Sequence, residues 1–172
     1  IFCFSTDFSH YSISFSYNGN VDYVYLSAFS ETPIILDHFV VTSDTTLSGS
    51  QPYFVKDTLK VEEGATLNID AGVRLYFHNG ASLYVDGILN CNGKVDNQIE
   101  MRYFRGDNLF KDTKYYLAPG NWKGVWLSQK SGDCNILSTN IIGAYQCLVV
   151  DSAFVDRKVI VGNSQIYNAK RG

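Results

Sequence analysis

The sequence predicts an all-β protein that folds as a right-handed parallel β-helix, a solenoid whose three-sided coils stack on one another. Tyrosine (12 residues) and phenylalanine (11 residues) are frequent, which favours strands. No long stretch has helical periodicity, and glycine-containing turns separate short runs that alternate with period 2. Apolar–variable–apolar triplets recur at intervals of about two dozen positions, at Val73–Leu75, Ile99–Met101, Val125–Leu127 and Leu148–Val150.

Residues 1–30 are expected to contain a β-hairpin. Ser12–Tyr17 and Val21–Phe29 alternate in polarity, and Asn18–Gly19–Asn20 supplies a turn between them. A hairpin alone is marginally stable in water. We therefore interpret it as the remnant of a β-sandwich, with pairing to a partner chain or capping of the solenoid as alternatives.

Residues 31–54 are expected to be a linker with an N-terminal cap strand. Pro33 interrupts the strand pattern, Ile34–Val41 is a short apolar run, and Thr42–Ser50 is rich in Ser, Thr and Gly. The first coil of a solenoid needs a cover for its core and its unpaired strand edge. The Ile34–Val41 run is the expected cover.

The β-helix itself is predicted over residues 55–172, truncated at its C-terminus, with three short strands per coil. Glycine in the turns permits backbone conformations with positive φ. Equivalent positions are expected to stack in register along each side of the coil: Leu59 and Val61 with Leu83 and Val85, Leu67 and Ile69 with Leu89 and Cys91, Ile136 with Val159, and Ile142 with Ile166.

Composition and cysteine spacing exclude several classes of protein. The net charge of −3 does not indicate a nucleic-acid-binding protein. No apolar stretch reaches the length of a membrane-spanning helix. The cysteines form no C-x-x-C pair, and no histidine stands at zinc-ligand spacing. Buried core thiols are therefore expected, with no metal and no cofactor, at Cys3, Cys91, Cys134 and Cys147.

Two stretches carry a family resemblance. They are Leu59-x-Val61-x-x-Gly64-Ala65-Thr66-Leu67-x-Ile69-x-x-Gly72-Val73-x-Leu75-x-Phe77 and Pro119-Gly120-Asn121-Trp122-Lys123-Gly124-Val125-Trp126-Leu127. The chain resembles right-handed parallel β-helix proteins of the Bacteroidota, which are predicted surface or outer-membrane lipoproteins. An immunoglobulin-like β-domain often precedes the helix in that family, and its last hairpin is similar to residues 13–27 here.

The resemblance implies an outer-membrane, cell-surface or periplasmic location in a Gram-negative bacterium. The lipobox cysteine of the family is absent here, and Cys3 lacks the preceding signal sequence. Contact with a membrane is therefore expected only through a lipid anchor that the sequence does not contain. The partners implied are a polysaccharide or another envelope protein.

One row of outward-facing residues is a candidate binding surface. If Val73, Leu75 and their equivalents face inward, the residues between them face solvent. The expected outward row is Arg74, Glu100, Trp126 and Val149. Arg74 and Glu100 are expected to pair across neighbouring rungs, and Trp126 can stack on the apolar face of a sugar. The alternative for Trp126 is burial under the loop that precedes it.

The loop over residues 102–122 is the second candidate, because long excursions from a regular scaffold often carry binding residues. Residues 102–123 contain five basic and two acidic side chains, a local charge of +3. The proposed binding residues on this loop are Arg102, Arg105, Tyr115, Tyr116 and Trp122. A basic and aromatic surface suits an anionic or uronic polysaccharide. In the alternative interpretation, the aromatic side chains pack on the helix and the charges are solvated.

The sequence favours a non-catalytic module that presents a flank for glycan or protein binding. Polysaccharide hydrolases need clustered carboxylates, and the outward row contains one acid, Glu100. The three histidines are scattered and no Ser-His-Asp arrangement is indicated. One alternative is a polysaccharide lyase or hydrolase whose active face lies in missing coils. The other is a structural subunit of an outer-membrane complex.

Overall fold

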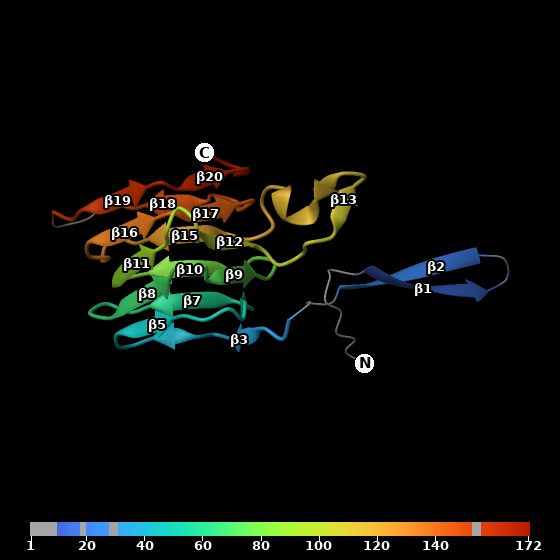
Figure 1. The fold of residues 1–172 in the computed structure, drawn as a ribbon, viewed down its shortest axis with the longest axis horizontal. Coiled ribbons are helices and arrows are strands. Elements are labelled where there is room, and N and C mark those ends of the chain that lie inside the picture. Colours follow the sequence, from blue (N-terminus) through green and yellow to red (C-terminus); the bar gives the residue numbers. More distant parts are fainter. Residues whose placement is uncertain (1–9, 18–19, 28–30, 153–155) are drawn as a thin grey trace.

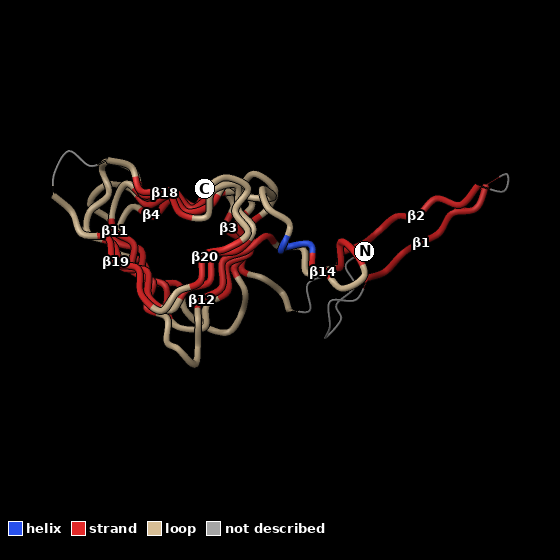
Figure 2. The backbone as a smooth tube through the Cα atoms, turned by 90° about the horizontal axis from the view of Figure 1, so that it is seen from above, coloured by secondary structure: helices blue, strands red, loops and turns tan. Residues whose placement is uncertain are grey.

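The computed structural model of the protein describes residues 10–17, 20–27, 31–152 and 156–172. Its main body consists of three parallel sheets in which strand stacks on strand (Figure 1). Viewed along the stack, the sheets form the sides of a triangle (Figure 2) that encloses one apolar core. The predicted fold class, an all-β, three-sided parallel β-helix, is therefore confirmed.

Each coil contributes one strand to each side. Sheet I contains β3 (Ile34–Leu36), β6 (Tyr53–Val55), β9 (Arg74–Phe77), β12 (Ile99–Tyr103), β17 (Thr139–Ile142) and β20 (Gln165–Tyr167). Sheet II contains β4 (Val40–Val41), β7 (Thr58–Val61), β10 (Ser82–Val85), β15 (Gly124–Leu127) and β18 (Leu148–Val150). Sheet III contains β5 (Thr45–Leu47), β8 (Thr66–Asp70), β11 (Ile88–Asn92), β16 (Cys134–Leu137) and β19 (Val159–Gly162).

The register of the early coils agrees with the prediction. Leu59 lies beside Leu83 in sheet II, and Leu67 lies beside Leu89 in sheet III, each pair joining one coil to the next. These side chains all face inward and are fully buried. A shift of one residue would turn them to the outer face, so the apolar pattern fixes the register here.

Two expected pairings in the later coils are wrong. Val159 lies beside Cys134 rather than Ile136, and Ile166 lies beside Ile141 rather than Ile142. The outer coils have weaker patterns, because β19 and β20 expose apolar side chains on both faces. The spacing of apolar residues alone then does not determine which of them pair.

The β-helix begins at Ile34, earlier than the expected boundary at residue 55. Strands β3, β4 and β5 pair in parallel with β6, β7 and β8. Residues 31–54 therefore hold the first coil instead of a linker, and the Ile34–Val41 run supplies β3 and β4 instead of a cover. These edge strands are two or three residues long, which limits the unpaired backbone at this end.

Residues 104–123 leave the stack between β12 and β15, and we call this segment the excursion. It contains the hairpin β13 (Asn108–Phe110) and β14 (Thr113–Lys114), followed by the 3-10 turn η1 (Tyr115–Leu117). Figure 1 shows it projecting from the side of the stack. Leu83 pairs with Leu59 on the preceding coil and with Val125 on the following coil. Because the excursion intervenes, Val125 is much further from Leu83 in the sequence than Leu59 is.

Strands β1 (His10–Tyr17) and β2 (Asn20–Ser27) form an antiparallel pair, as the alternation predicted. Two residues of the predicted turn, Asn18 and Gly19, lie outside the described residues, as does Cys3. The assignment of this hairpin to a β-sandwich stays a prediction.

Three of the cysteines lie in the core as expected. Cys91, Cys134 and Cys147 are buried free thiols. Burial raises the pKa of Cys91 to about 12, so its thiolate is scarce at neutral pH. These side chains therefore pack as small apolar residues.

A row of asparagines runs up the outer face of sheet III. Asn68, Asn90 and Asn135 occupy the same position on three successive strands. Asn135 Nδ2 donates to Asn90 Oδ1 and Asn90 Nδ2 donates to Asn68 Oδ1, both over 3.1 Å. We call these three residues the asparagine row.

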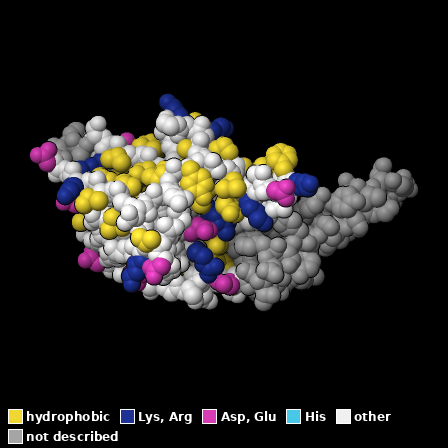
Figure 3. All heavy atoms as spheres, turned by 45° about the horizontal axis from the view of Figure 1, so that its top comes forward, with side chains coloured by type: hydrophobic (Ala, Val, Ile, Leu, Met, Phe, Trp, Pro, Cys, Tyr) yellow, Lys and Arg dark blue, Asp and Glu magenta, His cyan; other side chains and the backbone are white. Residues whose placement is uncertain are grey.

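The last coil exposes apolar side chains that its predecessors bury. Val150, Val161 and Ile166 are between 41 and 48 % exposed, whereas Leu127, Ile136 and Ile141 one rung below are fully buried. Hydrophobic side chains accordingly gather on this end of the molecule (Figure 3).

Candidate functional site

The expected outward row is divided between two sheets, which corrects the sequence interpretation. Arg74 and Glu100 are neighbours in sheet I, but Trp126 lies in sheet II between Tyr84 and Val149. The excursion is the reason. It occupies the positions after β12, so the triplet that follows Ile99–Met101 in the sequence falls on the next side of the triangle.

The expected ion pair between Arg74 and Glu100 does not form, although the two residues are in register. Arg74 donates instead to the carboxylate of Glu31 over 2.6 Å and to the carbonyl of Ser50. Glu100 accepts a hydrogen bond from Arg102 on its own strand. Both charges are therefore compensated within the chain, and neither favours an external charged ligand.

Arg102 attaches the excursion to sheet I. Its guanidinium carbon lies 4.1 Å from the ring centroid of Tyr76 and 4.3 Å from that of Tyr116, which belongs to η1. The side chain is also ion-paired with Glu100 and donates to the carbonyl of Tyr103 over 2.9 Å. Only 6 % of Arg102 is exposed, so it serves the fold and does not reach a ligand.

Arg102→Met is expected to lower the free energy of unfolding by about 2 kcal/mol, because a desolvated cation–π contact is lost while the apolar stem is kept. The excursion should become the first site of proteolysis. Limited proteolysis followed by mass spectrometry checks this, with Lys111→Met as the control for loss of an exposed positive charge on the excursion. Cleavage unchanged in Arg102→Met would contradict the assigned anchoring role.

Arg105 and Tyr115 also contact each other within the excursion. The Arg105 guanidinium lies 3.8 Å from the Tyr115 ring centroid and is ion-paired with Asp107. The hydrogen bond to Asp107 raises the pKa of Arg105 further. Much of the predicted basic and aromatic surface is thus an internal packing layer. The packed tyrosines agree with the alternative interpretation, but Arg102 and Arg105 are ion-paired instead of solvated.

Trp122 lies in the core and is 1 % exposed, so it is not available to a surface ligand. Its ring stacks on Phe77, with centroids 4.1 Å apart and planes at 12°. Its Nε1 donates to the carbonyl of Ile142 over 2.9 Å. This residue closes the corner where the chain re-enters the stack after the excursion.

Trp126 faces solvent as predicted, at 36 % exposed. It stands on the outer face of sheet II, in a row with Lys60, Tyr84 and Val149 on successive strands. Its Nε1 donates to Asp151 Oδ2 over 2.8 Å, which fixes the orientation of the indole. We call Lys60, Tyr84, Trp126 and Val149 the aromatic row.

Polar groups border the aromatic row where the strands of sheet II end. Asp86 accepts a hydrogen bond from Ser128 Oγ over 2.6 Å, and Lys60 Nζ lies 3.6 Å from the Asp86 carboxylate. With Asp151, they place carboxylate and ammonium groups beside exposed aromatic surface. A surface of this kind combines stacking with hydrogen bonding.

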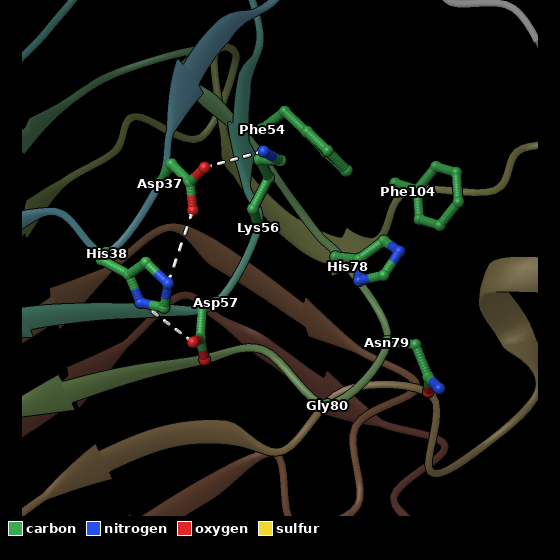
Figure 4. A pocket seen from close by; sticks show the side chains of 9 residues that line it. All are labelled: Asp37, His38, Phe54, Lys56, Asp57, His78, Asn79, Gly80 and Phe104. Carbon is green, nitrogen blue, oxygen red and sulfur yellow. Dashed lines mark hydrogen bonds and ion pairs between the residues drawn. The ribbon is translucent and has the colours of Figure 1, made fainter.

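A groove of about 560 Å³ lies at the corner between sheets I and II (Figure 4). We call it the corner groove; its lining is Asp37, His38, Phe54, Lys56, Asp57, His78, Asn79, Gly80 and Phe104. These residues come from four successive coils, at or next to the turns that follow β3, β6, β9 and β12.

An ion pair and a histidine–carboxylate contact hold one side of the corner groove. Lys56 Nζ lies 2.7 Å from Asp37 Oδ2, and His38 Nδ1 lies 3.0 Å from Asp57 Oδ2 (Figure 4). The hydrogen bond from Lys56 lowers the pKa of the Asp37 carboxyl, which therefore stays ionised to lower pH. The lining contains no hydroxyl or thiol for the His38–Asp57 pair to activate as a nucleophile.

Aromatic rings form the other side. His78 stacks on Phe104, with centroids 5.7 Å apart, and Phe54 meets both rings edge-on at 6.0 and 5.4 Å. Sequence analysis missed this groove. A signal was nevertheless present, because Asp37, Lys56, His78 and Phe104 each follow the last inward-facing residue of a sheet I strand.

Comparisons of the chain with models of known protein families, with curated proteins and with solved structures found no match. Across the described residues, no group of three or more His, Cys, Asp or Glu side chains is placed to hold a metal ion. Over the same part of the chain, no helix has the length and apolar character that crossing a bilayer requires.

Proposed function

We propose that this protein is a non-catalytic glycan-binding module whose aromatic row contacts an extended polysaccharide. The observation that carries the proposal is the exposed indole of Trp126, held in place by Asp151 and flanked by Tyr84 on the next strand. Aromatic side chains whose orientation is fixed bind apolar surfaces at low cost in conformational entropy.

The chemistry of the row suits a sugar. The C–H faces of a pyranose ring are apolar and can stack on an indole or phenol ring, while its hydroxyl groups need hydrogen-bond partners at the edges. Asp151, Asp86 and Lys60 supply such partners beside Trp126 and Tyr84. Successive rungs lie about 4.8 Å apart, so the row offers contacts to consecutive parts of an extended chain.

The proposal includes a location at the bacterial surface or outer membrane, with a polysaccharide or another envelope protein as partner. Its support is the sequence resemblance to β-helix surface lipoproteins. A flat outer face repeated from coil to coil is suited to long ligands, since binding contacts add along the stack.

Trp126→Ala is expected to weaken polysaccharide binding at least about thirtyfold, the effect of losing a hot-spot aromatic residue. A glycan array with neutral and uronic polysaccharides identifies the ligand, and titration calorimetry measures the affinities. Trp126→Phe should retain part of the affinity because it keeps a ring.

Phe110→Ala is the matched control, because Phe110 is 71 % exposed but lies on the excursion and not on sheet II. It should bind like the wild type. The proposal is overturned if Trp126→Ala binds with unchanged affinity, or if no polysaccharide on the array binds the wild-type protein.

A further inference from the structure

We propose that the corner groove is a second binding site, and that it takes a single neutral sugar ring. The site is separate from the aromatic row, which lies on the outer face of sheet II. Its volume of about 560 Å³ falls within the usual range for small-molecule sites. One wall of the groove is aromatic and the other is polar, so the groove can contact both the apolar face and the hydroxyl groups of a sugar ring.

The aromatic wall is built by the ladder itself. His78 and Phe104 follow β9 and β12, which pair in register, so their rings stack with planes at 24°. Phe54 packs edge-on against both rings and holds them in place. A wall of fixed rings provides a stacking surface for the apolar face of a sugar.

The polar wall is also fixed before any ligand binds. His38 has a φ of 47°, a backbone conformation that is uncommon for a residue other than glycine. This turn directs its imidazole to Asp57 on the next coil, where Nδ1 lies 3.0 Å from the carboxylate. An ionised carboxylate accepts up to four hydrogen bonds, so Asp57 retains acceptor capacity for sugar hydroxyl groups. The side-chain amide of Asn79 adds a donor and an acceptor.

The charges select against an anionic ligand. Lys56 is ion-paired with Asp37, so the two charges compensate each other. The Asp57 carboxylate contacts His38 and is not paired with Lys56, so it repels the carboxylate of a uronic acid. A neutral polyhydroxyl ring avoids this conflict and uses the same groups as hydrogen-bond partners.

Nuclear magnetic resonance tests this with the 19.3 kDa protein and single-ring probes. Methyl β-glucopyranoside, methyl β-galactopyranoside and methyl α-mannopyranoside are the neutral probes, and methyl α-galacturonide is the anionic probe. We expect at least one neutral glycoside to shift the amide signals of Asp57, Asn79 and Gly80 in a saturable manner. The galacturonide should bind at least about tenfold more weakly.

Two variants test whether the glycoside binds in the corner groove. Asp57→Asn keeps the shape but removes a charged acceptor, so it should weaken the neutral glycoside about tenfold and reduce the discrimination against galacturonide. Phe104→Leu keeps an apolar side chain against the core but removes a stacking ring, and should also weaken binding. Glu63→Gln is the matched control for loss of an exposed carboxylate, because Glu63 lies in the turn between β7 and β8.

The outcomes separate this proposal from the proposed function. Groove signals that shift normally in Trp126→Ala support an independent site, even if that variant has lost polysaccharide binding. The proposal is overturned if no neutral glycoside shifts the groove signals, if galacturonide binds as tightly as the neutral probes, or if binding survives unchanged in both Asp57→Asn and Phe104→Leu.

Discussion

Trp122→Ala is expected to lower the free energy of unfolding by about 3–5 kcal/mol, the range for removing a large buried aromatic side chain. The indole is fully enclosed and stacks on Phe77 in the middle of the core. Its removal leaves a cavity beside Phe77 and takes away the donor that the carbonyl of Ile142 uses. Both effects act at the corner that joins the excursion to sheet II.

Trp126→Ala is the internal control for this change. The same deletion at an exposed position should cost less than about 1 kcal/mol. The chain contains two tryptophans, so each variant leaves a single fluorescent reporter. Urea unfolding followed by fluorescence and by circular dichroism measures both variants. Equal loss of stability in the two would contradict the distinction between a core and a surface tryptophan.

Gly124→Ala is expected to destabilise the fold by at least about 3 kcal/mol, with a fall in Tm of about 10 °C for a chain of this size. Gly124 begins β15 with a φ of +114°, and a Cβ on it would lie 1.7 Å from the carbonyl oxygen of Gln146. Because that oxygen belongs to the backbone, a rotamer change cannot relieve the overlap. The two neighbouring coils would have to separate locally.

Gly64→Ala separates the two causes of this loss. Gly64 has a φ of +84°, but a Cβ on it would meet nothing within 4 Å. Only the backbone conformation is then unfavourable, at a cost of about 1–2 kcal/mol. Differential scanning calorimetry of the two variants measures the difference. If both variants lower the free energy of unfolding by the same amount, the overlap with the Gln146 carbonyl oxygen does not contribute to the loss.

The architecture was predictable because it depends on local patterns. Period-2 alternation marks each strand, and turns at nearly constant separation mark each corner, so Leu59 could be matched to Leu83 without a structure. The first coil escaped recognition because its strands are two or three residues long and leave little pattern to detect.

The rows on the outer faces were harder to predict. The same apolar triplet occurs on all three sides of the triangle, so a regular spacing along the chain does not tell which side a triplet belongs to. The excursion lengthens the chain between β12 and β15. Trp126 therefore lies in sheet II beside Tyr84, and not in sheet I with Glu100. Its outward orientation was nevertheless confirmed, because alternation depends only on the residue's own strand.

The binding residues predicted on the excursion illustrate a second limit. Arg102, Arg105 and the tyrosines form a basic and aromatic sequence, but they stack and pair with one another. Sequence alone does not show whether a cation and an aromatic ring satisfy each other or await a ligand. The corner groove was missed for the opposite reason, since its residues are far apart in the chain and adjoin only when coils stack.

The asparagine row has a consequence for how the coils find their partners. Asn135 and Asn90 each donate to the amide oxygen of the asparagine on the preceding coil, so both hydrogen bonds run in the same direction along the stack. If β11 slid by one residue, Asn90 would enter the hydrocarbon interior while Leu89 and Cys91 emerged into water. A shifted register therefore costs free energy on both surfaces of the sheet at once, because it buries an amide and exposes apolar side chains.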